Sequence, residues 1–196
     1  LNDYDVEMQG KAKAVAFSNL EKRLQSKQIP LDGVGLQCHF SIGDVDSVKL
    51  EKTIRLFGEA GLKCIITELD MGVPSTTTAN LEEQARLYRV ITDIVLNNDN
   101  CPNMVIWGIK DNDSWRSGSN PLLYNSGMQA KPAWRAVRSA LRHRTLTDGI
   151  ETITPRGSYS RMSKESWYDL SGRQVVGRIL PKGIYIKDGM KFIVRP

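Results

Sequence analysis

Residues 64–74 read CIITELDMGVP, and this stretch decides the fold. It opens with an apolar, β-branched run at residues 65–67, which predicts a buried strand. Two carboxylates, Glu68 and Asp70, follow just before a turn that glycine and proline mark. Because residues i and i+2 of a strand face the same side, the two acids are expected next to each other. Such a strand end is either solvated or part of an active site.

The sequence on both sides of this stretch alternates between strand-like and helix-like patterns. Apolar residues at helical spacing predict helices over residues 11–26, 46–60, 78–96 and 131–142. Short apolar runs predict strands within residues 1–6, 31–40, 62–70 and 103–111. This alternation indicates an α/β fold with a parallel sheet covered by helices. A closed (β/α)8 barrel takes about 250 residues, so four strands with polar residues at their ends suggest half of a TIM barrel.

The pattern changes after Arg144. A polar linker is expected over residues 145–161 and a small all-β module over residues 162–196. Within the module, Asp188 and Gly189 separate two apolar runs, which is typical of a β-hairpin. The predicted domains are therefore the half-barrel at residues 1–144, the linker and the module.

Composition and charge exclude several classes of protein. The chain has 196 residues, of which 40% are hydrophobic and 25% are charged, as in an ordinary globular protein. No apolar run approaches the roughly 20 residues of a membrane span. The first 144 residues hold 18 Lys and Arg against 17 Asp and Glu, so we expect no nucleic-acid surface on them. Three cysteines without short spacing form neither a disulfide framework nor a zinc site.

Further polar and aromatic residues occur where the predicted strands end. Gln37 and His39 repeat the i, i+2 arrangement on the preceding strand, and a histidine there could hydrogen-bond a carboxylate. A histidine by itself is more often a packed core residue. Trp107 and Trp115 could form platforms for the apolar faces of sugar rings, although core packing is the alternative, above all for Trp107.

Other catalytic motifs are missing. The sequence has no G-x-S-x-G, no P-loop and no G-x-G-x-x-G that opens a helix. A metal site would have to rest on His39, Glu68 and Asp70, and we expect no metal and no cofactor. What remains is carboxylate chemistry beside aromatic rings, which points to glycoside hydrolysis.

Four motifs resemble consecutive motifs of the family 10 glycoside hydrolases, the endo-1,4-β-xylanases. They are NDYD at residues 2–5, DGVGLQCH at 32–39, ITELD at 66–70, and VIWGIKDNDSW followed by PLLYNSGMQAKPAW at 105–134. The resemblance covers residues 1 to about 141. It implies a (β/α)8 barrel of which this chain supplies strands five to eight, a retaining mechanism, and xylan or xylo-oligosaccharides as the substrate.

The resemblance also implies roles for single residues. Glu68 would be the nucleophile, His39 would hydrogen-bond it, and Asp70 would orient that histidine. Five further residues would contact the sugar: Asn2, Tyr4, Gln37, Trp107 and Trp115.

Three departures from the family are visible. The general acid/base Glu of the family's Asn-Glu-Pro motif is absent, so we expect it on an upstream segment, and a complementary N-terminal half of the barrel as partner. Asp5 stands where the family often has Asn. Cys101 lacks the family's usual disulfide partner, because that region reads Val95-Leu96.

Residues 167–194 resemble the small β modules that end many exported enzymes of the Bacteroidetes. This second resemblance implies a secreted or cell-surface protein. Two other functions stay open from the sequence. The chain could be a non-catalytic xylan-binding or structural fragment, or part of another retaining β-glycanase of the same clan, such as a cellulase.

Overall fold

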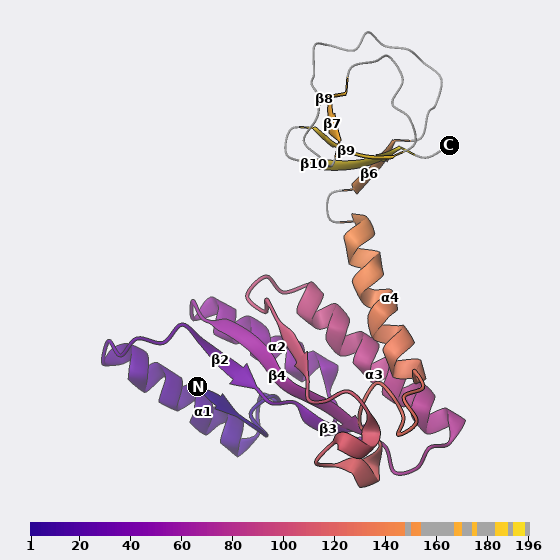
Figure 1. Cartoon of the computed structure of the whole chain (residues 1–196). Coiled ribbons are helices and arrows are strands. Elements are labelled where there is room, and N and C mark those ends of the chain that lie inside the picture. The colour runs from indigo at the N-terminus through magenta and orange to yellow at the C-terminus, as the bar shows by residue number, and fades with distance from the viewer. Residues whose placement is uncertain (148–149, 154–166, 170–173, 176–182, 188–189, 195–196) are drawn as a thin grey trace. The chain divides into compact units, whose positions relative to one another are not determined.

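The computed structural model describes residues 1–147, 150–153, 167–169, 174–175, 183–187 and 190–194. Contacts within the chain divide it into two units, Leu1–Leu141 and Arg142–Pro196 (Figure 1). Each unit is described by itself below.

The first unit alternates strands and helices as expected. Its strands are β1 (Asn2–Asp3), β2 (Gly33–Leu36), β3 (His39–Ser41), β4 (Lys63–Gly72) and β5 (Met104–Ile106). Its helices are α1 (Ala12–Ser26), α2 (Ser47–Glu59), α3 (Thr78–Leu96) and α4 (Pro132–Thr147), with 3-10 turns η1 (Asp111–Asp113) and η2 (Ser117–Ser119). Every ladder is parallel: β1 pairs with β2, β2 and β3 pair with successive parts of β4, and β5 pairs with β4. The predicted strand over 31–40 is thus interrupted between β2 and β3.

Local sequence signals account for the helix boundaries. Side-chain oxygens of Asp46 and Thr77 accept hydrogen bonds from backbone N–H groups in the first turns of α2 and α3, which caps both helices. The observed α3 coincides with the predicted helix. The last helix was expected to end at Arg142, but α4 continues to Thr147 because no glycine or proline occurs before Gly149.

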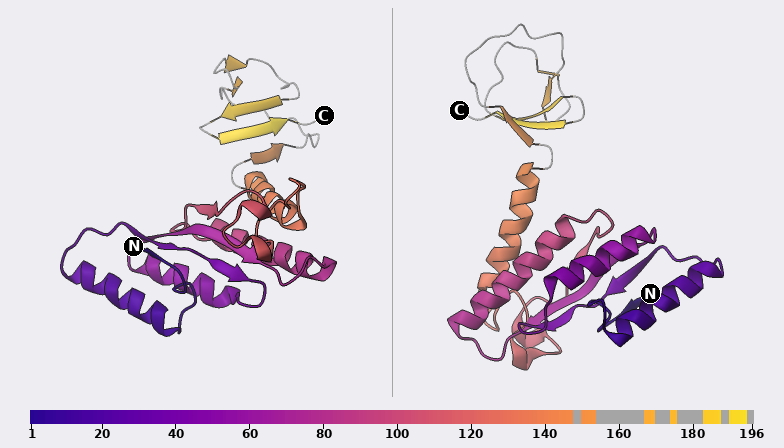
Figure 2. Two further views of the ribbon diagram at one scale, coloured as in Figure 1. Left: turned by 60° about the horizontal axis from the view of Figure 1, so that its bottom comes forward. Right: turned by 180° about the vertical axis from the view of Figure 1, so that it is seen from behind.

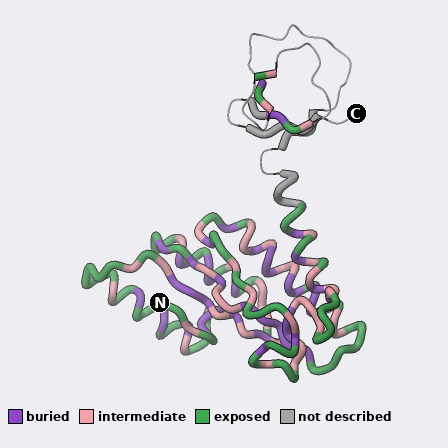
Figure 3. The backbone as a smooth tube through the Cα atoms, viewed as in Figure 1, coloured by how far each residue is buried: buried purple, intermediate pink, exposed green. Residues whose placement is uncertain are grey.

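The core lies between the sheet and the helices. Figure 2 shows α1, α2 and α3 along one face of the sheet. Leu36, Ile66 and Leu69 from the strands pack there with Ile54 and Ile91 from the helices, and all five are fully buried. The buried segments in Figure 3 follow the strands and the inward sides of the helices.

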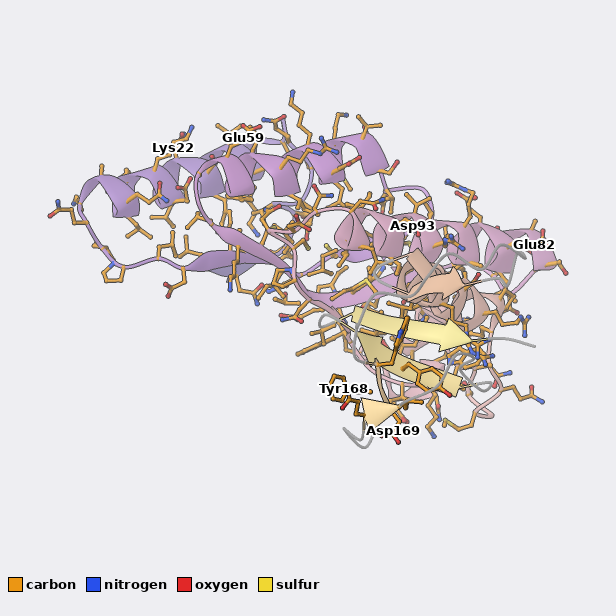
Figure 4. The ribbon with its side chains drawn as sticks, turned by 90° about the horizontal axis from the view of Figure 1, so that it is seen from above. Lys22, Glu59, Glu82, Asp93, Tyr168 and Asp169 are labelled. Atoms are coloured by element: carbon orange, nitrogen blue, oxygen red, sulfur yellow. The ribbon has the colours of Figure 1, made fainter. Side chains whose placement is uncertain are left out.

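The outer side of the helices carries exposed charges, among them Lys22 and Glu59 (Figure 4). No helix in the described ranges is both long enough and apolar enough to cross a membrane.

The second unit contains a small sheet. Its strands are β6 (Ile150–Ile153), β7 (Trp167–Asp169), β8 (Gln174–Val175), β9 (Gly183–Lys187) and β10 (Met190–Val194), in the order β6–β10–β9–β7–β8. Strands β9 and β10 are antiparallel with Lys187 opposite Met190, which is the pairing of the expected hairpin. Its turn residues, Asp188 and Gly189, lie outside the described residues. Trp167 and Tyr185 are buried together.

The predicted linker at 145–161 contains regular structure. Helix α4 extends into it as far as Thr147, and residues 150–153 form β6, which pairs in parallel with β10. Two isoleucines and a threonine favour a strand there, although the run is short. Residues 148–149 and 154–161 of that prediction lie outside the described residues.

All three cysteines are free and buried. Burial raises the pKa of the Cys38 and Cys64 thiols well above the usual range, and that of Cys101 to about 11. The three side chains therefore act as small apolar groups of the core.

Candidate active site

Glu68 lies on a bulge of strand β4. Between Ile66 and Asp70, β4 has one residue more than the β2–β3 segment opposite it. The register with β5 shifts in the same way between Ile66 and Leu69. A bulge leaves the extra residue out of the ladder and re-aims the side chains around it, which is common next to active sites.

The bulge turns two consecutive side chains to one side. Thr67 donates a 2.9 Å hydrogen bond to Oδ1 of Asn2, and Nδ2 of Asn2 donates a 3.1 Å hydrogen bond to Oε1 of Glu68. In a regular strand, residues 67 and 68 would face opposite sides of the sheet. Because both contact the same amide, Asn2 on β1 fixes one oxygen of Glu68.

Gly35 on β2 leaves the space that this arrangement needs. A β-carbon at residue 35 would lie 2.6 Å from Oδ1 of Asn2 and 2.9 Å from Cγ2 of Thr67. These distances are shorter than any real contact, so a larger residue would displace the Asn2 amide from Glu68.

His39 lies between the two carboxylates. Its Nε2 is 3.3 Å from Oε2 of Glu68, and its Nδ1 is 2.9 Å from Oδ2 of Asp70. An imidazolium would donate to both carboxylates, whereas a neutral ring donates to only one. The predicted link from Glu68 through His39 to Asp70 is therefore present as a continuous row of contacts.

The two acids have different surroundings. Glu68 keeps 16% of its side chain exposed, but Asp70 is fully buried. Besides His39, Asp70 accepts a 2.9 Å hydrogen bond from Nε1 of Trp115 and a 2.7 Å hydrogen bond from Nη1 of Arg116. Three partners around this buried carboxylate hold it in place.

Arg116 is a site residue that sequence reasoning missed. Besides Asp70, its guanidinium binds the carbonyl oxygen of Phe40 at 2.9 Å and Oγ of Ser41 at 3.1 Å. The loop with η1 and η2 thereby joins the ends of β3 and β4 (Figure 1). Gly72 permits this approach, since a β-carbon there would lie 3.1 Å from Nη2 of Arg116. A lone arginine next to a tryptophan carries no pattern that would reveal the role.

A second ion pair supports the same loop from inside. Nζ of Lys131 lies 3.1 Å from Oδ2 of Asp111, with both side chains almost fully buried. Lys131 also donates to the carbonyl oxygen of Asn120 at 2.7 Å, and Asp111 accepts from the backbone N–H of Leu122 at 2.8 Å. Burial lowers the pKa of Lys131, and Asp111 opposes that shift. Both ends of the loop that carries Trp115 are thus fixed.

Three aromatic side chains are exposed near the site. Trp115 is 67% exposed while one edge of its ring contacts His39 at a centroid distance of 5.0 Å. Trp107 and Tyr4 are about half exposed, and the ammonium of Lys13 lies 3.4 Å from the centre of the Tyr4 ring. Exposed, oriented rings of this kind can stack on the apolar faces of sugars.

The predicted residues do not all form one connected group. Glu68, His39, Asp70, Asn2 and Trp115 are joined by hydrogen bonds or charge contacts. Across the described structure, no side-chain hydrogen bond or ring contact links the other three predicted residues to this group: Tyr4, Gln37 and Trp107. The backbone N–H of Trp107 does bind the carbonyl oxygen of Leu69 at 3.0 Å, beside the bulge.

Asp5 fits a position that the family often fills with Asn. Its backbone is left-handed, with φ of 56°, and both Asn and Asp tolerate this conformation better than other residues with a β-carbon.

Within the described ranges, no group of three His, Cys, Asp or Glu is arranged to hold a metal ion.

Comparison with known families gives a match over most of the first unit. The model of glycosyl hydrolase family 10 matches residues 1–140. The chain belongs to glycosyl hydrolase family 10. Glu68, His39 and Asp70, the bulged strand and both tryptophans all lie within the matched residues.

Solved structures and curated relatives agree with the family 10 assignment. Endo-1,4-beta-xylanase A of Thermoanaerobacterium saccharolyticum is 37% identical over 70% of this chain and 12% of the relative. Native xylanase 10B of Thermotoga maritima superposes with a TM-score of 0.69 and 30% identity, over 73% of this chain and 46% of that chain. Xylanase 10B of Thermotoga petrophila in complex with xylobiose gives a TM-score of 0.69 at 29% identity, over 73% and 46% of the two chains.

These comparisons identify the first unit as part of an α/β barrel. The chain spans less than half the length of each of the three proteins.

Proposed function

We propose that this chain supplies the nucleophile half of a retaining endo-1,4-β-xylanase, which hydrolyses the β-1,4-xylosidic bonds of xylan. One observation carries the proposal: Glu68 is held by Asn2 at 3.1 Å and His39 at 3.3 Å, yet is still accessible at the end of a parallel strand. Active sites of α/β barrels lie at this end of the strands. The strands β1, β2 with β3, β4 and β5 are then the fifth to eighth strands of the barrel.

The reaction proceeds in two displacements. Glu68 attacks the anomeric carbon while the bond to the leaving oxygen breaks and a general acid protonates that oxygen. Water, deprotonated by the same group acting as a base, then attacks the glycosyl ester and releases Glu68 as a carboxylate. Asn2 and His39 keep the carboxylate aimed at the sugar between the two steps.

The second carboxyl group must come from elsewhere. A retaining enzyme needs its two carboxyl groups about 5–5.5 Å apart across the scissile bond. Asp70 is unsuited, because it is fully buried and its oxygens are occupied by His39, Trp115 and Arg116. We assign the acid/base to a glutamate of a complementary N-terminal half of the barrel.

The sheet offers surfaces on which such a half would fit. The outer edges of β1 and β5 carry unpaired backbone groups among the described strands. At the β5 edge, Val105 is 45% exposed and Trp107, which follows the strand, is 47% exposed. An open groove of about 430 Å³ follows the sheet, lined in part by Gly33, Gly35 and Thr67. Four more parallel strands would pair both edges and fill this groove.

The substrate follows from the aromatic residues and from a relative. Trp107 and Trp115 would line the sugar next to the cleaved bond together with Gln37, and Asn2 and Tyr4 would lie along the cleft. The Thermotoga petrophila xylanase, whose fold matches this chain, was solved with xylobiose. Xylan and xylo-oligosaccharides are therefore the first substrates to test.

The decisive experiment joins this chain to the N-terminal four β/α units of a family 10 xylanase. We expect xylan hydrolysis by the joined enzyme and none by E68Q. A 2-fluoro-xylobioside should label Glu68, which mass spectrometry of the peptide locates. Hydrolysis of xylan by this chain alone at the rate of the joined enzyme would disprove the assignment of the acid/base to another segment.

A non-catalytic role is the second candidate. Trp115 is 67% exposed on this chain, so it could bind xylan without any chemistry at Glu68. Binding without a label on Glu68 in the joined enzyme would favour this function.

A different retaining β-glycanase, such as a cellulase, would use the same nucleophile with other sugar contacts. Hydrolysis rates on cello-oligosaccharides and xylo-oligosaccharides separate these two activities.

We further propose that the protein is exported or attached to the cell surface, because xylan is a polymer that does not cross membranes. The resemblance of residues 167–194 to modules of exported enzymes supports this. Cell fractionation followed by detection of the chain in the medium, on the surface or in the cytoplasm tests it.

A further inference from the structure

The backbone between Gln37 and His39 adopts an unusual conformation. Cys38 is left-handed, with φ of 62°. Residues with a β-carbon rarely adopt this conformation unless the surroundings enforce it. It separates β2, which ends at Leu36, from β3, which begins at His39. The direction of His39 therefore depends on what holds Cys38.

Glu7 makes the contact that holds it. Oε1 of Glu7 accepts a 2.8 Å hydrogen bond from the backbone N–H of Cys38. Glu7 is 2% exposed and Cys38 is fully buried, so no water can replace this bond. A buried N–H without a partner is costly, so the side chain of Glu7 stabilises this turn.

The neighbouring amides are bonded to the sheet. The N–H of Gln37 donates to the carbonyl oxygen of Asp3 at 3.1 Å, and the N–H of Asp70 donates to the carbonyl oxygen of Cys38 at 3.4 Å. Cys38 is thus held on one side by strand β4 and on the other by a side chain from the segment after β1. The carboxylate of Glu7 thus accepts the hydrogen bond of a backbone N–H that lies between β2 and β3, where the pairing of these strands with β4 is interrupted.

We propose that Glu7 is a positioning residue that fixes His39, and through it the nucleophile Glu68, by holding the left-handed backbone at Cys38. Among the described residues, no hydrogen bond or ion pair joins Glu7 to Glu68, and the hydrogen bond of Glu7 to the Cys38 N–H acts through the backbone. The inference rests on the proposed function, since it concerns the geometry of the same carboxylate.

The contacts of His39 explain why a small change at Cys38 matters. Both ring nitrogens have partners, at 3.3 Å on Glu68 and 2.9 Å on Asp70. A rotation of the adjacent peptide moves the ring away from both partners at once. A displacement of 1 Å near a reacting group can cost about a hundredfold in rate.

The test compares three variants of the full chain. E7Q keeps an oxygen that accepts the hydrogen bond, whereas E7L removes it. E21L is the matched control, because Glu21 is 1% exposed in α1 and its Oε1 has no hydrogen-bond partner within the described structure. The sequence has only two histidines, so the imidazole nitrogen signals of His39 can be assigned by comparison with a variant of His143.

Imidazole NMR of the full chain should show the His39 signals shifted in E7L and unchanged in E7Q and E21L. In the joined enzyme, kcat on xylan should fall about tenfold to hundredfold in E7L, with a smaller change in KM. E7Q should stay close to the wild type. Signals and kcat in E7L that match those of E21L would overturn the proposal. An E7Q variant as impaired as E7L would also overturn it, because the charge and not the hydrogen bond would then matter.

A glycine at residue 38 gives a test that does not depend on the stability of E7L. Glycine adopts the left-handed backbone freely, so the loss caused by E7L should be smaller in a C38G background than in the wild type. Equal losses in both backgrounds would contradict the role of Glu7 at this turn. If the joined wild-type enzyme is inactive while E7L, but not E7Q or E21L, shifts the His39 signals, the proposed function is refuted and the positioning role is still supported.

Discussion

The guanidinium of Arg116 lies 2.7 Å from Oδ1 of Asp70, and this contact separates the roles of two acids that stand two residues apart. Asp70 is fully buried with the arginine as its cation, whereas Glu68 keeps 16% of its side chain exposed. Asp70, whose carboxylate is enclosed by its partners, can position neighbouring side chains. Glu68, which is partly exposed to solvent, can reach a substrate.

The two acids should therefore differ in their effect on stability. D70N leaves Arg116, which is 19% exposed, without its counter-charge and should lower the free energy of unfolding by about 3–5 kcal/mol. E68Q should lower it far less, because Glu68 is partly solvated and an amide still bonds Asn2. Urea unfolding of the full chain measures both. Equal losses would show that Asp70 is not the structural member of the pair.

A methyl group at Gly35 should disturb Glu68 through Asn2. G35A places a β-carbon 2.6 Å from Oδ1 of Asn2 and should cost about 1–3 kcal/mol of stability from overpacking. It should also lower kcat in the joined enzyme. G43A is the control, since no atom lies within 4 Å of a β-carbon there and its φ is not positive. If both variants behave alike, the close approach at residue 35 is unimportant.

The pH dependence of stability should carry a signature of Glu7. Burial raises the pKa of this carboxyl group, although the hydrogen bond from Cys38 opposes the shift. The folded state therefore holds the proton more tightly than the unfolded state. The stabilisation from Glu7 is complete below the unfolded pKa and is lost as the pH rises through the folded pKa.

Glutamine at residue 7 cannot titrate, so E7Q should gain stability relative to the wild type as the pH rises through that window. Urea unfolding of both proteins across the window gives the difference directly. Groups with lowered pKa, such as Asp3 and Glu83, contribute equally to both proteins and cancel. Parallel curves for the two proteins would contradict the raised pKa.

The buried pair of Lys131 and Asp111 should matter more than the exposed pair on the same loop. K131M removes the cation that faces the buried carboxyl group of Asp111 and should lower the free energy of unfolding by about 3–5 kcal/mol. K110M removes an exposed contact of 3.6 Å to Asp113 and should change little. Thermal unfolding and protease cleavage within residues 107–131 check both. Resistance of K131M to cleavage equal to that of K110M would argue against a fixed loop.

The thiols should be unreactive in the folded chain. All three cysteines are buried, and burial raises the pKa of each, so the reactive thiolate is scarce at neutral pH. Ellman's reagent should titrate three thiols in denaturant and far fewer, slowly, without it. A fast reaction of the native chain would show that the core around at least one of the three cysteines opens readily.

Much of the fold follows from periodicity alone. The apolar spacing in residues 78–96 marks helix α3 from end to end, because a capping threonine starts it and a long stripe faces the sheet. The same reasoning placed Glu68, His39 and Asp70 at neighbouring strand ends. The alternation of side chains between the two faces is a property of each single strand, so it can be predicted from one sequence without knowledge of the neighbouring strands.

Other features of the site depend on contacts between segments that are distant in the sequence, and no local sequence pattern predicts these contacts. The bulge in β4 exists only relative to its neighbours, so alternation cannot show that residues 67 and 68 share a side. Arg116 and Glu7 act from irregular segments, where a single charged residue is usually solvated. One weak signal existed for Glu7, since it stands between the apolar Val6 and Met8, which are both buried.

The hydrogen bond from Asn2 to Glu68 joins residues that are 66 positions apart in the chain. Closing so long a loop is entropically costly, and parallel strands can pair only after the intervening segments are in place. We therefore expect the contact between Asn2 and Glu68 to form late in folding, after β1, β2 and β4 have aligned. A probe at this hydrogen bond would report when β1, β2 and β4 have aligned.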